Sequence, residues 1–307
     1  MSTTSESHLV GLIGSGITAS LSPALHETEA RHHGLHYLYR AIDLDVIGRP
    51  AEDVGELLAA GRDLGFTAFN ITHPCKQLVL AHLDEIAPDA AALKAVNTVL
   101  VRDGRFIGHN TDQSGFASGL ATELPDAPKD SVVQLGTGGA GSAVAAALLS
   151  QGVQHLHLFD VDPGRATERA RAMSALFPDR RIAAASVQDL PGLVRAADGI
   201  VNATPVGMHH HPGTPIDTGL LDGTQWVAEV IYLPVDTELI VAARAAGCRV
   251  LDGGHMAVGQ AVDAFRLITG VEPDRARMRA HFLATLRARQ GADARVRRLP
   301  DLVTRPG

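Results

Sequence analysis

The sequence predicts a two-domain α/β protein, in which a smaller N-terminal α/β domain precedes a doubly wound parallel sheet of the Rossmann type. One observation is an apolar strand at 132–135 that runs into a glycine-rich turn and then an alanine-rich helix. A second is that strand-like and helical segments alternate from residue 132 onward. The strand-like segments lie near 132–135, 154–160, 181–186, 198–202, 226–232 and 248–252, which suits a sheet of six parallel strands.

The first hundred residues alternate between strand-like and helix-like segments and are therefore expected to form their own domain. The segments are 9–13, 23–33, 37–44, 51–64 and 66–71. After Gly253 and Gly254 the pattern is helical, at 258–268 and 274–288. No further strand accompanies these two helices, so we expect them to pack back onto the first domain. We assign 1–111, completed by 258–290, to a substrate-binding domain, 112–257 to a nucleotide-binding domain, and 291–307 to a flexible tail.

The glycine-rich turn is typical of a dinucleotide site. One glycine permits the tight turn, one lets the backbone approach a pyrophosphate, one allows close packing of helix and strand, and the amide groups face the phosphates. The residues expected to bind the cofactor here are Gly136, Gly138, Gly139, Ala140 and Gly141.

The strand after this turn ends in Asp160, where the adenosine ribose would lie. A carboxylate accepts hydrogen bonds from a ribose 2′-hydroxyl and repels a 2′-phosphate, so we predict NAD rather than NADP. Arg165 should be solvated or stack on adenine, with phosphate binding the weaker alternative. Asn202 and Thr204, which follow the strand at 198–202, should line the nicotinamide side.

Composition narrows the class of function. In 307 residues, 45% are hydrophobic and 20% are charged, and the net charge of −7 argues against a nucleic-acid surface. No apolar run is long enough to predict a membrane span. Cys75 and Cys248 fit neither a disulfide framework nor a zinc site, and the histidines at 209–211 lack partners for a metal. We expect a cytoplasmic monomer or homodimer that acts on a small molecule without a metal.

Chemistry is indicated where the strand at 66–71 meets a helix. Pro74 suits the first helical position, with Thr72 or His73 as cap, and Lys76 would then oppose the helix dipole in the first turn. A cation placed against this rule suggests proton transfer.

A hairpin and two helix starts supply further polar residues. The turn at 103–104 places Asn97 opposite Asn110, and Asp112 follows, either as part of a site or as the N-cap of a helix from about residue 113. Ser22, before Pro23, has the same ambiguity.

These motifs together resemble the shikimate/quinate dehydrogenases from Gly11 to about residue 285. The resemblance rests on residues 20–23, 70–76, 95–98, 108–112 and 259–261. It implies that Lys76 and Asp112 are the catalytic pair of a hydride-transferring enzyme. The residues that it implies around a polyhydroxylated cyclohexane carboxylate are Ser20, Ser22, Asn70, Thr72, Asn97, Tyr232 and Gln260.

Within that family the chain is most similar to the NAD-dependent quinate/shikimate subgroup. Asp160, Val161 and Asp162 stand where NADP-dependent members usually carry Asn-Arg-Thr. Quinate-competent members often have threonine at the position of Ser22, so shikimate use is better supported than quinate use. An aminoshikimate-type or other small polyol acid remains an alternative substrate, and a non-catalytic sensor of NAD and shikimate an alternative function.

Overall fold

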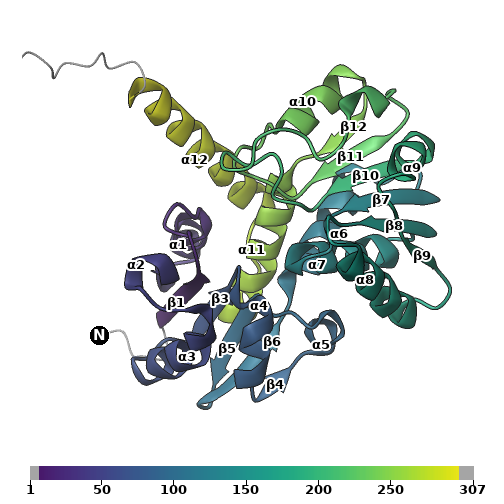
Figure 1. Ribbon diagram of the computed structural model, residues 1–307. Coiled ribbons are helices and arrows are strands. Elements are labelled where there is room, and N and C mark those ends of the chain that lie inside the picture. Colours follow the sequence, from purple (N-terminus) through teal and green to yellow (C-terminus); the bar gives the residue numbers. More distant parts are fainter. Residues whose placement is uncertain (1–6, 297–307) are drawn as a thin grey trace, which may run out of the picture.

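A computed structural model describes residues 7–296 of the chain, with side chains up to Arg289. It contains two six-stranded sheets, one formed before residue 110 and one after residue 130. In Figure 1 the two sheets lie in separate bodies, with helices α6 (Thr111–Glu123) and α11 (Gly253–Thr269) between them. The two-domain α/β prediction is therefore confirmed.

The first sheet has the strand order β2-β1-β3-β5-β6-β4. The strand β1 pairs in parallel with β2 and β3, whereas β5 runs antiparallel to β3 and β6. The strands are β1 (Ser7–Gly14), β2 (His36–Asp43), β3 (Ala68–Ile71), β4 (Glu85–Ile86), β5 (Thr98–Arg102) and β6 (Arg105–His109). The helices around them are α1 (Ser22–His32), α2 (Leu44–Ile47), η2 (Ala51–Asp53), α3 (Val54–Asp63), α4 (Cys75–Leu78), η3 (Val79–His82) and α5 (Pro88–Leu93).

The second sheet is parallel throughout and has the order β12-β11-β10-β7-β8-β9. Strand order reverses between β7 and β10, and α/β sheets bind their ligands at the carboxyl ends of the strands at such a point. The strands are β7 (Ser131–Leu135), β8 (His155–Phe159), β9 (Arg181–Ala184), β10 (Gly199–Asn202), β11 (Trp226–Glu229) and β12 (Arg249–Leu251), so all six predicted strands are present. The helices are α7 (Gly139–Ser150), α8 (Pro163–Leu176), α9 (Leu190–Ala196), η4 (Thr218–Leu220) and α10 (Glu238–Ala245).

The last helices return to the first domain, as predicted. Phe265 and Ile268 of α11 are buried in the same apolar cluster as Val10 and Tyr37 of the first sheet. The helix begins at Gly253 rather than near residue 258, because Asp252 caps it by accepting a hydrogen bond from the Gly254 N–H at 3.0 Å. Because glycine has a low helix propensity, the sequence pattern did not indicate that the helix begins at Gly253.

Helix α12 (Arg275–Val296) includes residues 291–296, which we assigned to a flexible tail, and the remainder of the predicted tail lies outside the described residues. The flexibility of this segment stays a prediction. The domain limits at residues 111 and 257 stay a prediction.

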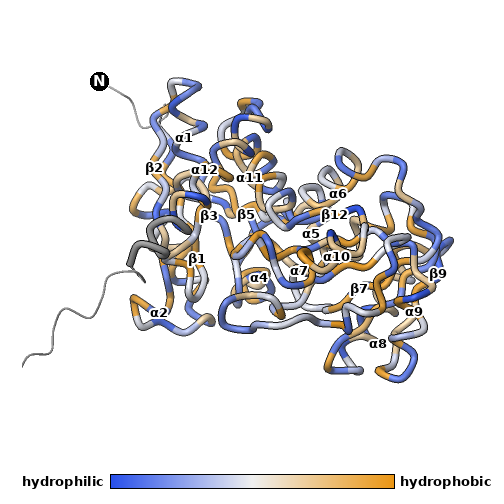
Figure 2. Tube along the Cα trace, turned by 90° about the horizontal axis from the view of Figure 1, so that it is seen from above, coloured by the Kyte–Doolittle hydropathy of each residue, from blue (hydrophilic) through white to orange (hydrophobic). Residues whose placement is uncertain are grey.

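Hydrophobic side chains fill both faces of the second sheet. One cluster joins α7 to β7 and β8, and another lies on the opposite face under α9 and α10. Figure 2 shows the hydrophobic stretches along the central strands and along α7. Because α7 consists mostly of alanine, glycine and serine, it packs close to the sheet and brings its N-terminus to the turn after β7.

Candidate active site

The loop after β3 positions Lys76, though not by the predicted cap. Pro74 occupies the N-cap position instead of the first helical position, and no side chain caps α4. The carbonyl of Thr72 accepts the Cys75 N–H at 2.8 Å, and the carbonyl of Lys76 accepts the Val96 N–H at 2.9 Å. These backbone bonds fix Lys76 against the chain that leads into β5. With four residues, α4 is also too short for the dipole argument to carry weight.

Lys76 and Asp112 are brought together. The Nζ atom of Lys76 lies 2.5 Å from Oδ2 of Asp112, and their side chains are only 17% and 8% exposed. Asp112 is not an N-cap: Asn110 holds that position, and its Oδ1 accepts the N–H groups of Asp112 and Gln113. The carboxylate of Asp112 is therefore free for Lys76.

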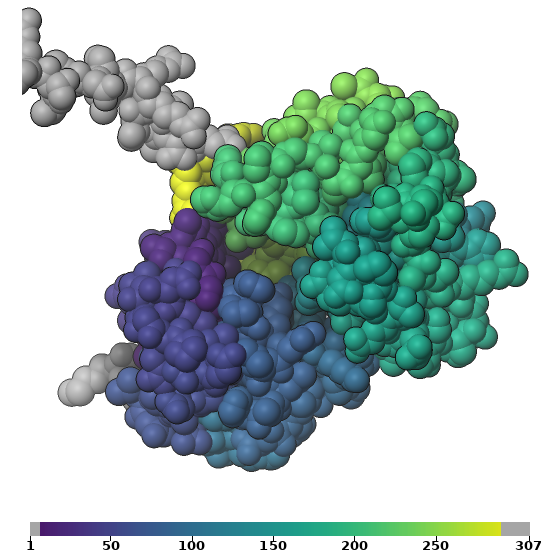
Figure 3. All heavy atoms as spheres, in the orientation of Figure 1, coloured from purple at the N-terminus to yellow at the C-terminus, as the bar shows by residue number. Residues whose placement is uncertain are grey.

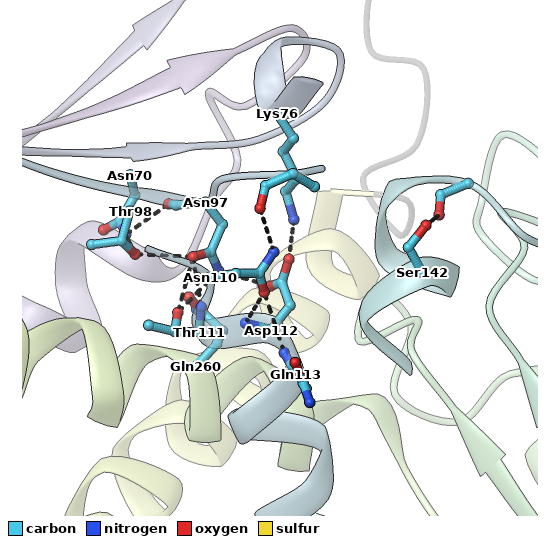
Figure 4. A network of polar contacts seen from close by, with 12 residues as sticks. Asn70, Lys76, Asn97, Thr98, Asn110, Thr111, Asp112, Gln113, Ser142 and Gln260 are labelled. Atoms are coloured by element: carbon cyan, nitrogen blue, oxygen red, sulfur yellow. Dashed lines mark hydrogen bonds and ion pairs between the residues drawn. The ribbon is translucent and has the colours of Figure 1, made fainter. Parts of the chain in front are cut away.

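Asn97 fixes the second oxygen of the same carboxylate. Its Nδ2 donates to Asp112 Oδ1 at 2.9 Å, while its Oδ1 accepts the Thr111 N–H at 2.8 Å. The hairpin register pairs Thr98 with His109, which confirms that Asn97 lies opposite Asn110. Figure 4 shows the resulting chain of contacts from Asn70 through Asn97 to Asp112, with Lys76 reaching the carboxylate.

Asn70 forms the buried end of this network. Its Nδ2 donates to Thr98 Oγ1 at 3.0 Å and to the carbonyl of Asn97 at 3.2 Å, and its Oδ1 accepts from the Tyr39 hydroxyl at 2.7 Å. Burial raises the pKa of Tyr39, so this hydroxyl keeps its proton and remains a donor. Thr72 stands at the end of β3, where its methyl group lies against Gly14.

Three predicted residues meet at the other side of the first domain. Ser20 Oγ accepts the Ser22 N–H at 3.2 Å, and Leu21 rather than Ser22 is the N-cap of α1. Tyr232, which follows β11 in the second domain, packs beside Leu21 and Leu25. Burial raises the pKa of Tyr232, and the side chain of Ser20 opposes this shift. Serine and tyrosine hydroxyls thus converge from two domains.

Two residues that the sequence reading missed hold this serine loop. Asp43, at the end of β2, accepts the Gly16 N–H at 3.0 Å and the Thr18 N–H at 2.8 Å. Arg289 of α12 donates to the carbonyls of Ala19 and Ser20. Asp43 lies near the end of the strand predicted at 37–44, a position that could have marked it as a candidate.

Gln260 lies on α11, which packs closely on α6. A Cβ on Gly115 would lie 2.5 Å from the backbone nitrogen of Gln260. Its Nε2 donates to the Ala257 carbonyl at 3.0 Å, which leaves its Oε1 available. In Figure 4, Gln260 lies beside Thr111, close to the network around Asn97. Of the predicted substrate residues, Asn97 contacts Asp112 directly, Asn70 is linked to it through Asn97, and Gln260 lies beside this network.

The turn after β7 has the shape that a pyrophosphate requires. Gly136 has φ +90°, and a Cβ there would lie 2.7 Å from the Ala203 carbonyl oxygen. A Cβ on Gly141 would lie 2.3 Å from the Gly136 oxygen, whereas Gly138 faces open space. Helix α7 begins at Gly139, so its free N–H groups, including that of Ala140, point at this space. These residues fit a dinucleotide phosphate.

The same turn faces the catalytic candidates. A Cβ on Gly139 would lie 3.9 Å from Cδ of Lys76, so the side chain of Lys76 passes directly in front of the turn. The space-filling view in Figure 3 shows a hollow between the first domain and the second. A cavity of about 300 Å³ between residues of the two domains is lined by Gln77, Leu80, Lys94, Glu168, Arg169 and Ala172.

Asp160 lies at the end of β8, as predicted, and is buried. Its Oδ2 accepts from the N–H and hydroxyl of Thr137, and its Oδ1 accepts from the Asp162 N–H. Burial alone would raise the pKa of Asp160, but these hydrogen bonds and the bond from Arg165 lower it to about 2. The carboxylate therefore carries a full negative charge at neutral pH.

Arg165 is not simply solvated. Its Nη2 donates to Asp160 Oδ1 at 2.6 Å, while its side chain stays 55% exposed. The Arg165 guanidinium can reach the Asp160 carboxylate because Asp160 directly follows β8 and Arg165 lies in the first turn of α8.

Asn202 and Thr204 lie where predicted, beside the turn, but their polar atoms are used internally. Asn202 is fully buried, and its Oδ1 accepts from the N–H and hydroxyl of Thr204 at 3.0 and 2.7 Å. Thr204 Oγ1 in turn accepts the Val206 N–H at 3.1 Å. The Asn202 amide therefore shapes the loop that lines the turn. That this loop borders the nicotinamide stays a prediction.

Among residues 7–289, whose side chains are described, no group of three or more His, Cys, Asp and Glu side chains is placed to hold a metal ion. No helix in that part of the chain combines the length and apolar character needed to cross a membrane.

Comparisons with known proteins agree on one family. Residues 12–99 match the family model described as the shikimate dehydrogenase substrate binding domain. The chain is 60% identical to a shikimate dehydrogenase (NADP(+)) of Arthrobacter sp. (strain FB24), over 94% of this chain and 99% of that protein. It is 49% identical to a quinate/shikimate dehydrogenase (NAD(+)) of Corynebacterium efficiens, over 91% of this chain and 99% of that protein.

A solved structure shares the whole fold. Quinate dehydrogenase from Corynebacterium glutamicum in complex with NAD superposes with a TM-score of 0.86 at 48% identity, covering 91% of this chain and 99% of that one.

Proposed function

Because the chain belongs to the shikimate dehydrogenase family, we propose that it is an NAD-dependent oxidoreductase that interconverts shikimate and 3-dehydroshikimate. Quinate and 3-dehydroquinate are the second substrate pair, favoured by the similarity to an NAD-bound quinate dehydrogenase. The observation that carries the proposal is the Lys76–Asp112 pair, held at 2.5 Å directly in front of a dinucleotide turn.

Lys76 acts as the acid/base group. In the oxidation direction, neutral Lys76 takes the proton from the reacting ring hydroxyl while the carbon that bears it loses hydride and becomes a carbonyl. A bound nicotinamide supplies the hydride acceptor in this direction and the donor in the reverse one. In the reverse direction, charged Lys76 returns its proton to the carbonyl oxygen.

Asp112 orients both partners of that proton transfer. Its Oδ2 holds Nζ of Lys76, and Asn97 keeps the carboxylate from rotating by binding Oδ1. A fixed carboxylate beside the ammonium also stabilises the charged state that forms as the proton arrives. Preorganisation of this kind supplies much of the rate gain in proton and hydride transfer.

The remaining site residues recognise the carboxylate and the ring hydroxyls of the substrate. Ser20, Ser22 and Tyr232 offer hydroxyl donors to a carboxylate, and Arg289 adds positive charge behind them. The ring hydroxyls are left to the amide, hydroxyl and backbone groups around the catalytic pair: Asn70, Thr72, Asn97 and Gln260. Hydrogen-bonding groups in a confined site reject analogues that lack the matching hydroxyl.

Asp160 supports NAD as the cofactor. Its charge and its position after β8 disfavour a 2′-phosphate, and the Arg165 guanidinium is already engaged by that carboxylate. The names of the relatives point both ways, since the 60% identical enzyme is named for NADP and the 49% identical one for NAD. The assignment of NAD as the cofactor therefore rests on Asp160.

The test is an initial-rate assay at 340 nm and alkaline pH that crosses shikimate and quinate with NAD and NADP. The proposal expects the highest rate with shikimate and NAD. Higher rates with NADP would overturn the cofactor assignment, and higher rates with quinate would reverse the order of substrates. Absence of turnover with all four pairs, in protein that binds NADH, would indicate another polyol acid or a sensor.

A further inference from the structure

Glu229 is a buried acid at the ligand edge of the second sheet. It is the last residue of β11, it is fully buried, and it is in register with Asn202, the last residue of β10. Asn202 is in turn in register with Leu135, the last residue of β7. The three strand ends form one row beside the switch point, where α/β sheets bind their ligands.

Both oxygens of Glu229 are saturated with donors. Oε1 accepts the backbone N–H groups of Val230 at 2.9 Å and Ile231 at 3.1 Å. Oε2 accepts from Nδ2 of Asn202 at 3.0 Å and the hydroxyl of Thr237 at 3.2 Å. The carboxylate of Glu229 offers acceptor sites on both oxygens. The amide of a glutamine at this position would instead point its NH₂ group at one of the two pairs of donors.

One branch of this network leads to the turn that receives the nucleotide. Asn202 also donates to the Val206 carbonyl at 2.9 Å, so its amide spans the loop at 203–206. The Ala203 N–H donates to the Leu135 carbonyl at 2.7 Å, and the Ala203 oxygen lies against Gly136. Glu229 thus sets the position of the backbone that closes the nicotinamide end of the turn.

The other branch leads to the substrate side. The two N–H groups bound to Oε1 belong to the residues directly before Tyr232, which packs beside Leu21 and Leu25 of the first domain. The carbonyl of Ile231 also packs on the start of α11, where a Cβ on Gly253 would lie 2.2 Å away. One buried carboxylate therefore joins the loop at 203–206 to the loop that carries Tyr232.

We propose that Glu229 is a positioning residue for the reaction: it fixes the nicotinamide-side loop and the Tyr232 loop relative to each other, and so sets the distance between hydride donor and acceptor. This inference rests on the proposed function, because it needs a nicotinamide at the turn. Glu229 touches neither reactant and acts through Asn202 and Tyr232. It differs from the predicted site residues, among which Asn202 was assigned to the cofactor itself.

The test compares Glu229→Gln with Asp198→Asn. Asp198 precedes the opposite end of β10, where its Oδ2 accepts the Ser131 N–H at 2.9 Å, so this control also removes a carboxylate that joins two strands, but far from the ligand edge. Each variant is titrated with NADH and with ADP-ribose, which shares everything but the nicotinamide. Steady-state rates with the better of the two acids are also measured per folded site.

For Glu229→Gln we expect kcat to fall about tenfold or more, since small displacements of reacting groups cost one to two orders of magnitude in rate. The KM for the acid should rise, and NADH binding should weaken while ADP-ribose binding stays within about twofold, because Asp160 and the glycine turn are untouched. Asp198→Asn should lower the melting temperature alone. Thr237→Val removes only one of the four bonds to Glu229 and should show the same changes in smaller measure.

The outcomes separate this inference from the proposed function. If Glu229→Gln and Thr237→Val both lose stability but keep kcat, KM and the NADH to ADP-ribose ratio of the control, Glu229 is structural and the inference is wrong. If the wild-type enzyme turns over neither acid, while Glu229→Gln still weakens NADH selectively, the proposed substrate is wrong and the positioning role is supported.

Discussion

Asn97 and Asp112 are joined by a hydrogen bond of 2.9 Å between Nδ2 and Oδ1, on the carboxylate oxygen that Lys76 does not use. The acid is thereby held between an amide and an ammonium, both buried or nearly so. It cannot turn without breaking one of these contacts. The proposed proton-transfer pair is therefore held in place by contacts within the chain itself.

Lys76→Met should lower kcat by about two to four orders of magnitude, the usual contribution of a general acid or base. NADH binding should stay near the wild-type value, since the glycine turn and Asp160 are unchanged. The measurement is steady-state turnover beside NADH fluorescence titration. Lys129→Met, before β7, is the matched control and should be fully active. Turnover above one tenth of wild type in folded Lys76→Met would remove the lysine from the mechanism.

Asn97→Ala should lower kcat by about tenfold to a hundredfold, because Asp112 loses the contact that stops its rotation. The free energy of unfolding should also fall by about 1 to 3 kcal/mol, since buried partners such as the Thr111 N–H are left unsatisfied. Rates and urea unfolding are measured on the same samples. A loss of stability with an unchanged kcat would show that Asn97 only supports the hairpin.

Asp160→Ala should shift the ratio of kcat/KM for NAD and NADP toward NADP by about tenfold or more, because it removes the repulsion of a 2′-phosphate and frees Arg165. The crossed assay measures this ratio. Asp162→Ala is the control, since Asp162 caps α8 by accepting the Gly164 N–H, and its loss should cost about 1 kcal/mol of stability. An unchanged ratio in Asp160→Ala would contradict the assignment of NAD.

Arg289→Gln should raise the KM for the acid several-fold and leave kcat nearly unchanged. The guanidinium holds the carbonyls of Ala19 and Ser20, and its charge lies behind the proposed carboxylate clamp. Arg287→Gln, on an exposed position of the same helix, serves as control. Equal KM values in the two variants would place Arg289 outside substrate recognition.

His26 should make the fold sensitive to acid. Burial lowers its pKa from 6.5 to about 3, so the neutral ring contributes stability that is fully present above pH 6.5 and is lost as the pH falls toward 3. Between pH 7 and pH 5 this linkage amounts to about 2 kcal/mol. His26→Phe keeps an aromatic ring beside Tyr39 and Phe265 but cannot titrate. The free energy of unfolding in urea should therefore depend less steeply on pH in the variant than in the wild type. The same pH dependence in both proteins would contradict the role given to His26.

The sequence was sufficient for elements defined by local pattern. The six strands of the second sheet, the hairpin register at Asn97 and the glycine turn all follow from periodicity and turn chemistry. Helix starts were predicted less well. Asn110 is the N-cap where Asp112 had been expected, because neighbouring polar residues each suit the position. Leu21 and Pro74 are the N-caps where Ser22 and Thr72 or His73 had been expected, and both lack a side-chain cap bond that residue type could have indicated.

Long-range contacts were beyond local pattern. Arg289 meets Ser20 across 269 residues, and Asp43 meets Thr18 across 25. Glu229 was missed for another reason: a lone acid at the end of an apolar strand has the same sequence signature whether it faces solvent or accepts four buried hydrogen bonds.

The return of α11 to the first sheet has a consequence for how the chain emerges during synthesis. The face of that sheet formed by Val10, Tyr37 and Leu100 is completed by Phe265 and Ile268. These two residues are synthesised only after all six strands of the second sheet. This apolar face of the N-terminal sheet therefore stays without its cover until the chain of the second domain has been made.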